Sequence, residues 1–232
     1  MTWANTWDTI VTTGAKFWKV DSLEVKEQAL HKIVDEWSAS SSPPSNNYDR
    51  PKLEIFCPLA GDDQFVFVAW KHGHSIVAMD LVPKALEQMR KQFTDGTWTK
   101  SMTTDDNTAV IWNHSSERVT LYEGDITIPR TELNGRFDAV YDKDSFGALP
   151  LNLRQPYCER LSEYTKQGGI VYSEVKNRND DKGAGPPFHV EKNDLMEKTN
   201  FGTNFIHKAS LGEVYPISNS NWTQTGHIMI RR

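Results

Sequence analysis

Residues 53–81 read LEIFCPLAGDDQFVFVAWKHGHSIVAMDL, and their pattern decides the fold of the chain. An apolar run, Leu53–Phe56, predicts a strand that ends in a loop containing proline and glycine. A helix-length segment, Gln64–His72, follows and is closed by a glycine. A second apolar run, Ser75–Met79, predicts another strand, and a carboxylate, Asp80, stands at its end. This order of strand, loop, helix and strand predicts the nucleotide-binding unit of a doubly wound sheet.

The loop at residues 58–63 indicates which ligand this unit would bind. A dinucleotide needs a pyrophosphate cradle built from three glycines and a helix N-terminus. The loop offers only Gly61, and its two carboxylates, Asp62 and Asp63, would repel a pyrophosphate. They suit S-adenosylmethionine, which carries a sulfonium and an ammonium, and Asp80 could then accept hydrogen bonds from the ribose. The alternative is an ordinary α/β unit whose acids stabilise the start of the helix.

Length and composition favour one soluble globular domain. The chain has 232 residues, a net charge of −5, and no basic cluster apart from the terminal pair of arginines. Generic nucleic-acid binding is therefore disfavoured. There is no signal-peptide pattern and no apolar run near the ~20 residues of a membrane span. The two cysteines, Cys57 and Cys158, have no partner at metal or redox spacing, which is typical of reduced thiols. We expect a cytoplasmic monomer that binds neither nucleic acid nor membrane.

The remaining chain alternates helices with strands, which predicts an α/β sheet that is mostly parallel and covered on both faces. Leu23–Trp37 has apolar residues at helical spacing, with Lys26 as a polar exception on that face. Thr94–Ser116 reads as a polar, irregular stretch with one short strand. Further helices are expected at Lys84–Phe93 and Pro156–Lys166, and further strands at Ala109–Trp112, Val119–Tyr122, Phe137–Tyr141, Ile170–Val175 and Gly226–Ile230.

Polar side chains follow two of these strands directly. Asp125 could reach an adenine amino group, with Ile126 against the ring; alternatively, Asp125 only caps its own turn. Asp142 and Lys143 end the strand at Phe137–Tyr141. Asp142 is the nearest candidate proton acceptor, although a structural strand-end carboxylate is the favoured interpretation. No histidine pair has zinc-site spacing, so we expect no metal.

Residues 1–20 contain four large rings, Trp3, Trp7, Phe17 and Trp18. So many rings in a short segment predict packing against the domain, and they could also cover a pocket as a lid.

Several segments resemble the thiopurine S-methyltransferase family, in the family's order and over nearly the whole chain. They are Trp3-x-x-x-Trp7 with Phe17, FCPLAG at 56–61, GHSIVAMD at 73–80, LYEGDITIPRT at 121–131, FDAVYDK at 137–143 and GPPFHV at 185–190. The resemblance implies a single class I methyltransferase domain over residues 1–232. Its fold would be Rossmann-like, with a doubly wound, mostly parallel sheet of the seven-stranded type.

The resemblance also implies roles for individual residues. Trp3, Trp7 and Phe17 would cover S-adenosylmethionine, and Leu59 and Gly61 would lie beneath its methionine part. Asp80 and Leu81 would take the ribose and the adenine edge, and Asp125 and Ile126 would take the adenine. Lys143 would touch both donor and acceptor, and Phe17, Lys143 and Phe188 would line the acceptor pocket. No catalytic base is implied.

Two positions depart from the family pattern. Lys143 stands where the family usually has an arginine, and it lacks the planar fork that grips a flat ring. Ser218 falls where the vertebrate enzymes have another arginine. We therefore expect methyl transfer by in-line displacement to a small thiol or another soft anion, in preference to a purine thiol. The alternatives are a nicotinamide-dependent oxidoreductase on the same sheet and a non-catalytic relative that binds the donor.

Overall fold

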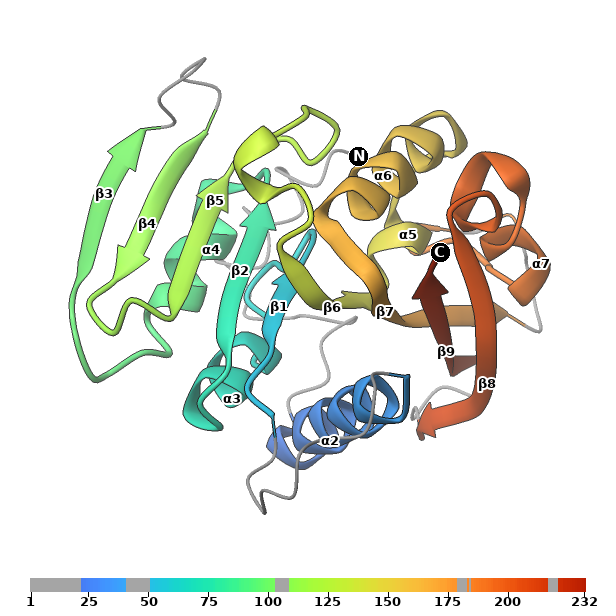
Figure 1. Cartoon of the computed structure of the whole chain (residues 1–232), viewed down its shortest axis with the longest axis horizontal. Helices are drawn as coiled ribbons and strands as arrows, with labels where there is room; N and C mark the ends of the chain where they lie inside the picture. The colour runs from blue at the N-terminus through green and yellow to red at the C-terminus, as the bar shows by residue number, and fades with distance from the viewer. Residues whose placement is uncertain (1–21, 41–50, 103–108, 179–182, 184, 217–220) are drawn as a thin grey trace.

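One mixed sheet forms the centre of the molecule. The computed structural model describes residues 22–40, 51–102, 109–178, 183, 185–216 and 221–232. Within them, nine strands follow the order β3-β4-β5-β2-β1-β6-β7-β9-β8, from left to right in Figure 1. The strands are β1 Glu54–Cys57, β2 Ser75–Asp80, β3 Trp98–Met102, β4 Val110–His114, β5 Val119–Glu123, β6 Phe137–Lys143, β7 Thr165–Arg178, β8 Phe205–Tyr215 and β9 Trp222–Arg231. The five central strands, in the sheet order β5-β2-β1-β6-β7, are parallel to one another. The pairs outside them, β3-β4, β4-β5, β7-β9 and β9-β8, are antiparallel.

Helices cover both faces of this sheet. Buried side chains of α2 (Leu23–Ser40), α3 (Phe65–Lys71) and α4 (Pro83–Arg90) belong to one core. Those of α5 (Ser145–Ala148), α6 (Leu151–Tyr164) and α7 (Lys192–Leu195) belong to the other. Short 3₁₀ and π turns occupy Thr131–Leu133 and Lys198–Gly202. The predicted α/β class, with helices on both faces, is confirmed.

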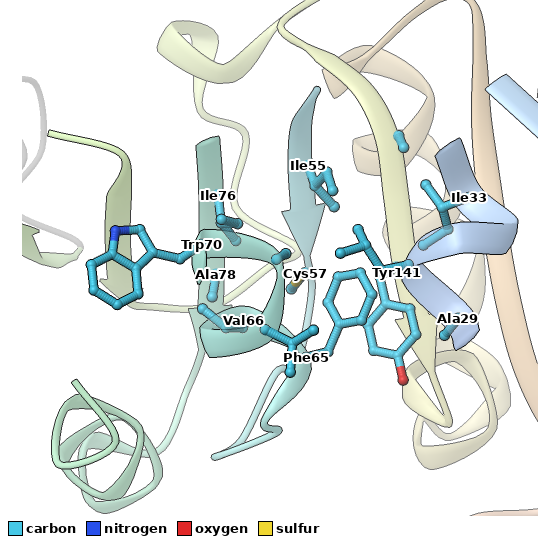
Figure 2. Close-up of a cluster of buried hydrophobic side chains, with 14 of the residues drawn as sticks. Ala29, Ile33, Ile55, Cys57, Phe65, Val66, Trp70, Ile76, Ala78 and Tyr141 are labelled. Carbon is cyan, nitrogen blue, oxygen red and sulfur yellow. The ribbon is translucent and has the colours of Figure 1, made fainter. Parts of the chain in front are cut away.

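Strand periodicity divides the apolar residues between the two cores. Along β1, Ile55 and Cys57 face the core beneath α2 and α3, while Phe56 faces the opposite core. Figure 2 shows the first core, in which Phe65 of α3 lies beside Tyr141 of β6. These two rings stack with centroids 3.7 Å apart. Central parallel strands buried on both faces carry continuous apolar runs, which is why β1 and β2 were recognisable from the sequence.

The polar stretch before β5 contains more structure than predicted. It forms two strands, β3 and β4, where one was expected, and this antiparallel pair extends the sheet beyond β5. The side chains of β3 are largely exposed, because β3 lies at the edge of the sheet. Trp98 is its anchor and packs edge-on against Phe93. An edge strand without an apolar alternation gives little signal in the sequence.

Other boundaries differ for local reasons. Helix α6 begins at Leu151, so Pro156 lies inside it rather than at its start. A proline inside a helix removes one backbone hydrogen bond. The helix continues through Pro156 because the buried face of α6 packs into the core. Strand β7 begins at Thr165 and includes the glycines that were expected to stop the preceding helix; Gly168 adopts a φ of +74° there. Strand β8, with alternating partly exposed residues, was not predicted.

Strand β1 offers a direct test of core packing. Ile55 is 0% exposed, whereas Ile206 on the edge strand β8 is 51% exposed. We expect Ile55→Val to lower the free energy of unfolding by about 0.5–1.5 kcal/mol, because it removes a buried methyl group. The matched Ile206→Val should change it by less than about 0.5 kcal/mol. Urea denaturation measures both, and equal values would contradict the assignment of Ile55 to the core.

Both cysteines, Cys57 and Cys158, are free and buried. Burial raises the pKa of each thiol well above its usual value, so neither is an activated nucleophile. Among the helices of the described residues, we find none with the length and apolar character needed to cross a bilayer.

Candidate active site

A cavity of about 270 Å³ lies where the central parallel strands end. It is built by the segments that follow β1, β2, β5 and β6 and by residues from α5 and α6. The arrowheads of β2 and β5 mark this edge of the sheet in Figure 1. Ligands of doubly wound sheets bind at this edge. The lining residues are Cys57–Asp63, Val66, Met79–Val82, Gly124–Thr127, Tyr141, Lys143–Ser145, Ala148–Pro150, Leu153 and Pro187.

The structure brings most of the predicted site residues into this one cavity. The residues concerned are Leu59, Gly61, Asp80, Leu81, Asp125, Ile126 and Lys143. Trp3, Trp7 and Phe17, and with them the predicted lid, lie outside the described residues. Ser218 lies outside them as well.

Phe188 is not among the residues that line the cavity; its neighbour Pro187 is. The Phe188 backbone N–H donates to the carbonyl of Gly147 at 2.7 Å, which fixes the segment beside α5. The ring of Phe188 lies over Gly185, where an added Cβ would come within 2.4 Å of it. The GPPF segment therefore presents a proline to the cavity.

Asp80 holds the loop that follows β1. Its Oδ2 accepts a hydrogen bond from the Gly61 N–H, and its Oδ1 accepts one from the Val82 N–H, both at 2.8 Å. Gly61 has a φ of +56°, a conformation that glycine adopts without strain. Burial raises the pKa of Asp80 to about 6, although these backbone hydrogen bonds oppose the shift. The backbone N–H of Leu81 also hydrogen-bonds to this carboxyl group.

The two acids of the loop have different surroundings. Both Asp62 and Asp63 line the cavity. Asp63 pairs with the ammonium of Lys26 at 2.7 Å, and Lys26 also donates to the Tyr141 hydroxyl at 3.3 Å. Lys26 is 1% exposed, so the polar exception on the apolar face of α2 is a buried ion-pair partner. This pair fastens α2 to the cavity loop.

Asp125 caps its own turn at the edge of the cavity. Its Oδ1 accepts hydrogen bonds from the backbone N–H and the hydroxyl of Thr127, both at 2.8 Å, so it caps its own turn. It also lines the cavity together with Ile126.

Asp142 is not among the residues that line this cavity. Its Oδ1 accepts from the N–H groups of Ser145 and Phe146 at 3.0 and 3.2 Å, and its Oδ2 accepts from the Ser173 hydroxyl at 3.3 Å. It is fully buried, and burial raises its pKa to about 6. Asp142 thus holds the turn into α5, as expected of a structural carboxylate at the end of a strand.

Lys143 and Asp144 form a buried ion pair at the end of β6. The Lys143 ammonium lies 2.8 Å from Asp144 Oδ2, and the side-chain amide of Gln224 donates to Oδ1 at 2.9 Å. Burial acts to lower the pKa of Lys143, but the carboxylates of Asp144, Glu174 and Asp63 outweigh it and raise the pKa. For Asp144, burial is outweighed by Lys143, Lys176 and Gln224, which lower its pKa. Both members are therefore charged.

The sequence interpretation missed one wall of the cavity. Its members are apolar: Ala148, Leu149, Pro150, Leu153 and Pro187. Most of them follow β6 within ten residues, so the rule that ligands lie beyond strand ends could have marked them. Among the residues that the structure describes, no group of three His, Cys, Asp or Glu side chains is arranged to hold a metal ion.

Comparison with known proteins identifies the family. The sequence profile of the thiopurine S-methyltransferases matches residues 16–216. The chain belongs to this family. Thiopurine S-methyltransferase from Legionella pneumophila (strain Corby) is 26% identical over 145 residues, and the enzyme from Vibrio atlanticus (strain LGP32) is 28% identical over 148. These matches cover 62% and 63% of this chain and 62% of each relative, so the alignment spans about three-fifths of the curated relatives' length.

Solved structures confirm the methyltransferase fold. A Burkholderia thailandensis 1,6-didemethyltoxoflavin-N1-methyltransferase with bound 1,6-didemethyltoxoflavin and S-adenosylhomocysteine superposes with a TM-score of 0.67 at 12% identity. The comparison covers 99% of this chain and 87% of that one. A magnesium protoporphyrin IX methyltransferase from Synechocystis PCC 6803 with bound S-adenosylmethionine gives a TM-score of 0.60 at 12% identity, with 98% and 96% covered. This member of the thiopurine S-methyltransferase family therefore has a class I methyltransferase fold.

Proposed function

We propose that this chain is an S-adenosylmethionine-dependent methyltransferase that methylates the sulfur of a small thiol. Membership of the family supports the reaction type. The observation that carries the proposal is the chemistry of the cavity lining, which combines several acidic side chains with apolar residues of the stretch 148–153. S-Adenosylmethionine carries a methyl group on a sulfonium; the thiolate of the acceptor would attack this methyl carbon, and S-adenosylhomocysteine would leave.

The acidic side chains of the lining fit a cationic donor. Asp80 would accept hydrogen bonds from the ribose hydroxyls, while it keeps Gly61 in place. Leu59 and Gly61 would lie beneath the methionine part, with Leu81 at the adenine edge, and Asp125 with Ile126 would bind the adenine. We further propose that Trp3, Trp7 and Phe17 cover the donor.

The protein's contribution to the reaction is alignment. Holding a thiol sulfur in line with the donor methyl group can supply up to about 7–11 kcal/mol. A thiol with a low pKa needs no dedicated base, because its thiolate is already present at neutral pH. This fits the position of Asp142, whose carboxylate serves the turn into α5 and does not line the cavity.

A nicotinamide-dependent oxidoreductase is the less favoured candidate. Its pyrophosphate would lie against the loop after β1, where Asp62 and Asp63 line the cavity. We also propose that the chain acts on a small molecule, that it is cytoplasmic and that it is a monomer; these three expectations stay predictions.

The proposed function has a direct test. Purified protein is incubated with S-adenosylmethionine and thiophenol, an aryl thiol of low pKa, and mass spectrometry follows the methyl thioether and S-adenosylhomocysteine. We expect both products in equal amounts, and neither when the thiol or the protein is omitted. A protein that binds S-adenosylhomocysteine in calorimetry but methylates no thiol would contradict thiol methylation. In that case it is a non-catalytic relative or acts on another acceptor class, such as a halide.

A further inference from the structure

We infer that the chain has a second binding site, between α2 and the strands β7 and β8, which takes a small organic cation: a primary ammonium group on an apolar body. A second cavity of about 250 Å³ lies there, almost as large as the first cavity at about 270 Å³. Its lining residues all come from α2, β7 and β8, and none of them lines the first cavity. A ligand in this second cavity is therefore distinct from the methyl donor and from the acceptor.

Glu174 of β7 supplies the group that would recognise the ligand. Its side chain lines the second cavity and is only 1% exposed. The Tyr215 hydroxyl donates a hydrogen bond to Oε2 at 3.1 Å, and Tyr172 brings a second hydroxyl close to the same carboxyl group. The other oxygen, Oε1, is buried and accepts no hydrogen bond from the residues that the structure describes. A buried oxygen without a donor is costly, so a ligand that brings a donor to it gains affinity.

The surroundings of Glu174 favour a donor that is positively charged. The charged side chains that act on it from neighbouring elements are Lys26, Asp63, Lys143 and Asp144. Each of these two lysines pairs with one of these two carboxylates. Burial raises the pKa of Glu174, and the lysines oppose the rise. An ammonium group in the cavity would act in the same direction as the lysines and stabilise the ionised carboxylate.

The outer part of the second cavity does not repel a cation. Lys32 of α2 lines it, but its ammonium lies 2.9 Å from the carboxylate of Glu36. Glu213 of β8 is exposed and adds a carboxylate to the lining. A cation that approaches from solvent therefore meets this carboxylate before it reaches Glu174.

The walls indicate what kind of cation fits. Val25 and Ala29 of α2 face Leu211 and Val214 of β8 across the cavity, and all four are apolar. Hard metal ions bind several oxygen ligands at once, and no three His, Cys, Asp or Glu side chains of the described ranges are arranged to hold one. Apolar walls instead stabilise an alkyl or aryl body, and aromatic side chains such as those of Tyr172 and Tyr215 favour an ammonium group.

The experiment compares two probes of similar shape that differ in charge. Benzylamine and benzyl alcohol are titrated into the protein by calorimetry at about pH 8, where alkylammonium groups remain charged. Saturating S-adenosylhomocysteine is present, so that the first cavity is occupied. We expect benzylamine to bind at least about tenfold more tightly, because its hydrogen bond to Glu174 joins two charged groups. No binding of benzylamine, or equal affinities for the two probes, would overturn the inference.

Glu174→Gln tests the group that would recognise the ammonium. Glutamine keeps an oxygen for the Tyr215 hydroxyl but replaces the other oxygen by an uncharged NH₂ donor. The affinity for benzylamine should fall at least about tenfold, and that for benzyl alcohol should stay within about twofold. Glu87→Gln makes the same change at an exposed pair with Lys91 on α4 and should alter neither affinity. A Glu174→Gln protein that binds benzylamine as well as wild type would place the amine elsewhere and contradict the assignment.

Val25→Trp tests the cavity without touching Glu174. Val25 is half-buried, and a tryptophan at this position would fill the space between α2 and β8. Both probes should bind at least about tenfold more weakly, whether or not Glu174→Gln folds. Unchanged binding of benzylamine to Val25→Trp would overturn the inference. These titrations measure no methyl transfer, so their failure leaves the proposed function standing. If S-adenosylhomocysteine does not bind, the proposed function fails, and the same titrations without it still test the second cavity.

Discussion

Asp80→Ala should weaken the binding of S-adenosylhomocysteine by at least about a hundredfold, because hydrogen bonds to a charged group contribute roughly 1.5–3 kcal/mol each. The carboxylate would bond the ribose of the ligand, and it also holds the N–H groups of Gly61 and Val82. Removing it therefore loses ligand contacts and releases the loop beneath the ligand. Titration calorimetry measures the affinity, and Asp95→Ala on the surface is the matched control. An affinity within threefold of wild type would remove Asp80 from the site.

The same residue should give binding a pH dependence. The pKa of Asp80 is raised from 3.8 to about 6, so the folded protein takes up a proton that the unfolded chain does not bind between these values. The contribution of Asp80 to stability therefore decreases as pH rises from about 4 to 6 and is constant above. The affinity for S-adenosylhomocysteine should change in the opposite direction. It should fall below pH 6, where the Asp80 carboxylate becomes protonated and accepts hydrogen bonds less well. Asp142 has a similar pKa, so the comparison with Asp80→Ala isolates the contribution of Asp80.

Lys26→Met should lower the free energy of unfolding by roughly 3–5 kcal/mol, because breaking a buried ion pair leaves one charge without its partner. Lys26 is 1% exposed and lies 2.7 Å from Asp63, which is itself 18% exposed. Adding Asp63→Asn to Lys26→Met should recover much of the loss, since the unpaired charge is then gone. Urea denaturation of the two single variants and the double variant gives the coupling energy.

Lys32→Met is the matched control for Lys26→Met on the same helix. Lys32 is 42% exposed and pairs with Glu36 one turn away, so its replacement should cost less than about 1 kcal/mol. Similar losses for the two lysines would mean that the buried pair does not stabilise the fold.

The sequence predicted the position of site residues that directly follow an apolar strand. Asp80, Asp125 and Lys143 each stand at the end of an apolar run, and parallel strands bring such ends to one edge of the sheet. The strands β1 and β2 were recognisable for the same reason: both faces are buried, so their apolar runs are continuous.

Contacts between distant segments were not predictable from local pattern. Lys26 and Asp63 are 37 residues apart, and only the packing of α2 against the loop brings them together. The pairing of Lys143 with Asp144 depends on a left-handed backbone at a residue other than glycine, and on Gln224 from β9. The segment that brings Pro187 to the cavity is joined to α5 by a backbone hydrogen bond from Phe188 to Gly147, which are far apart in the sequence.

The apolar wall and the loop held by Asp80 come from separate parts of the chain. Four of the five wall residues lie in the short stretch 148–153, whereas Asp80 holds the loop after β1. Evolution can therefore remodel the wall without disturbing the hydrogen bonds that hold this loop. For protein engineering, a library confined to positions 148–153 and 187 would vary the shape offered to the acceptor and leave the Asp80 loop intact.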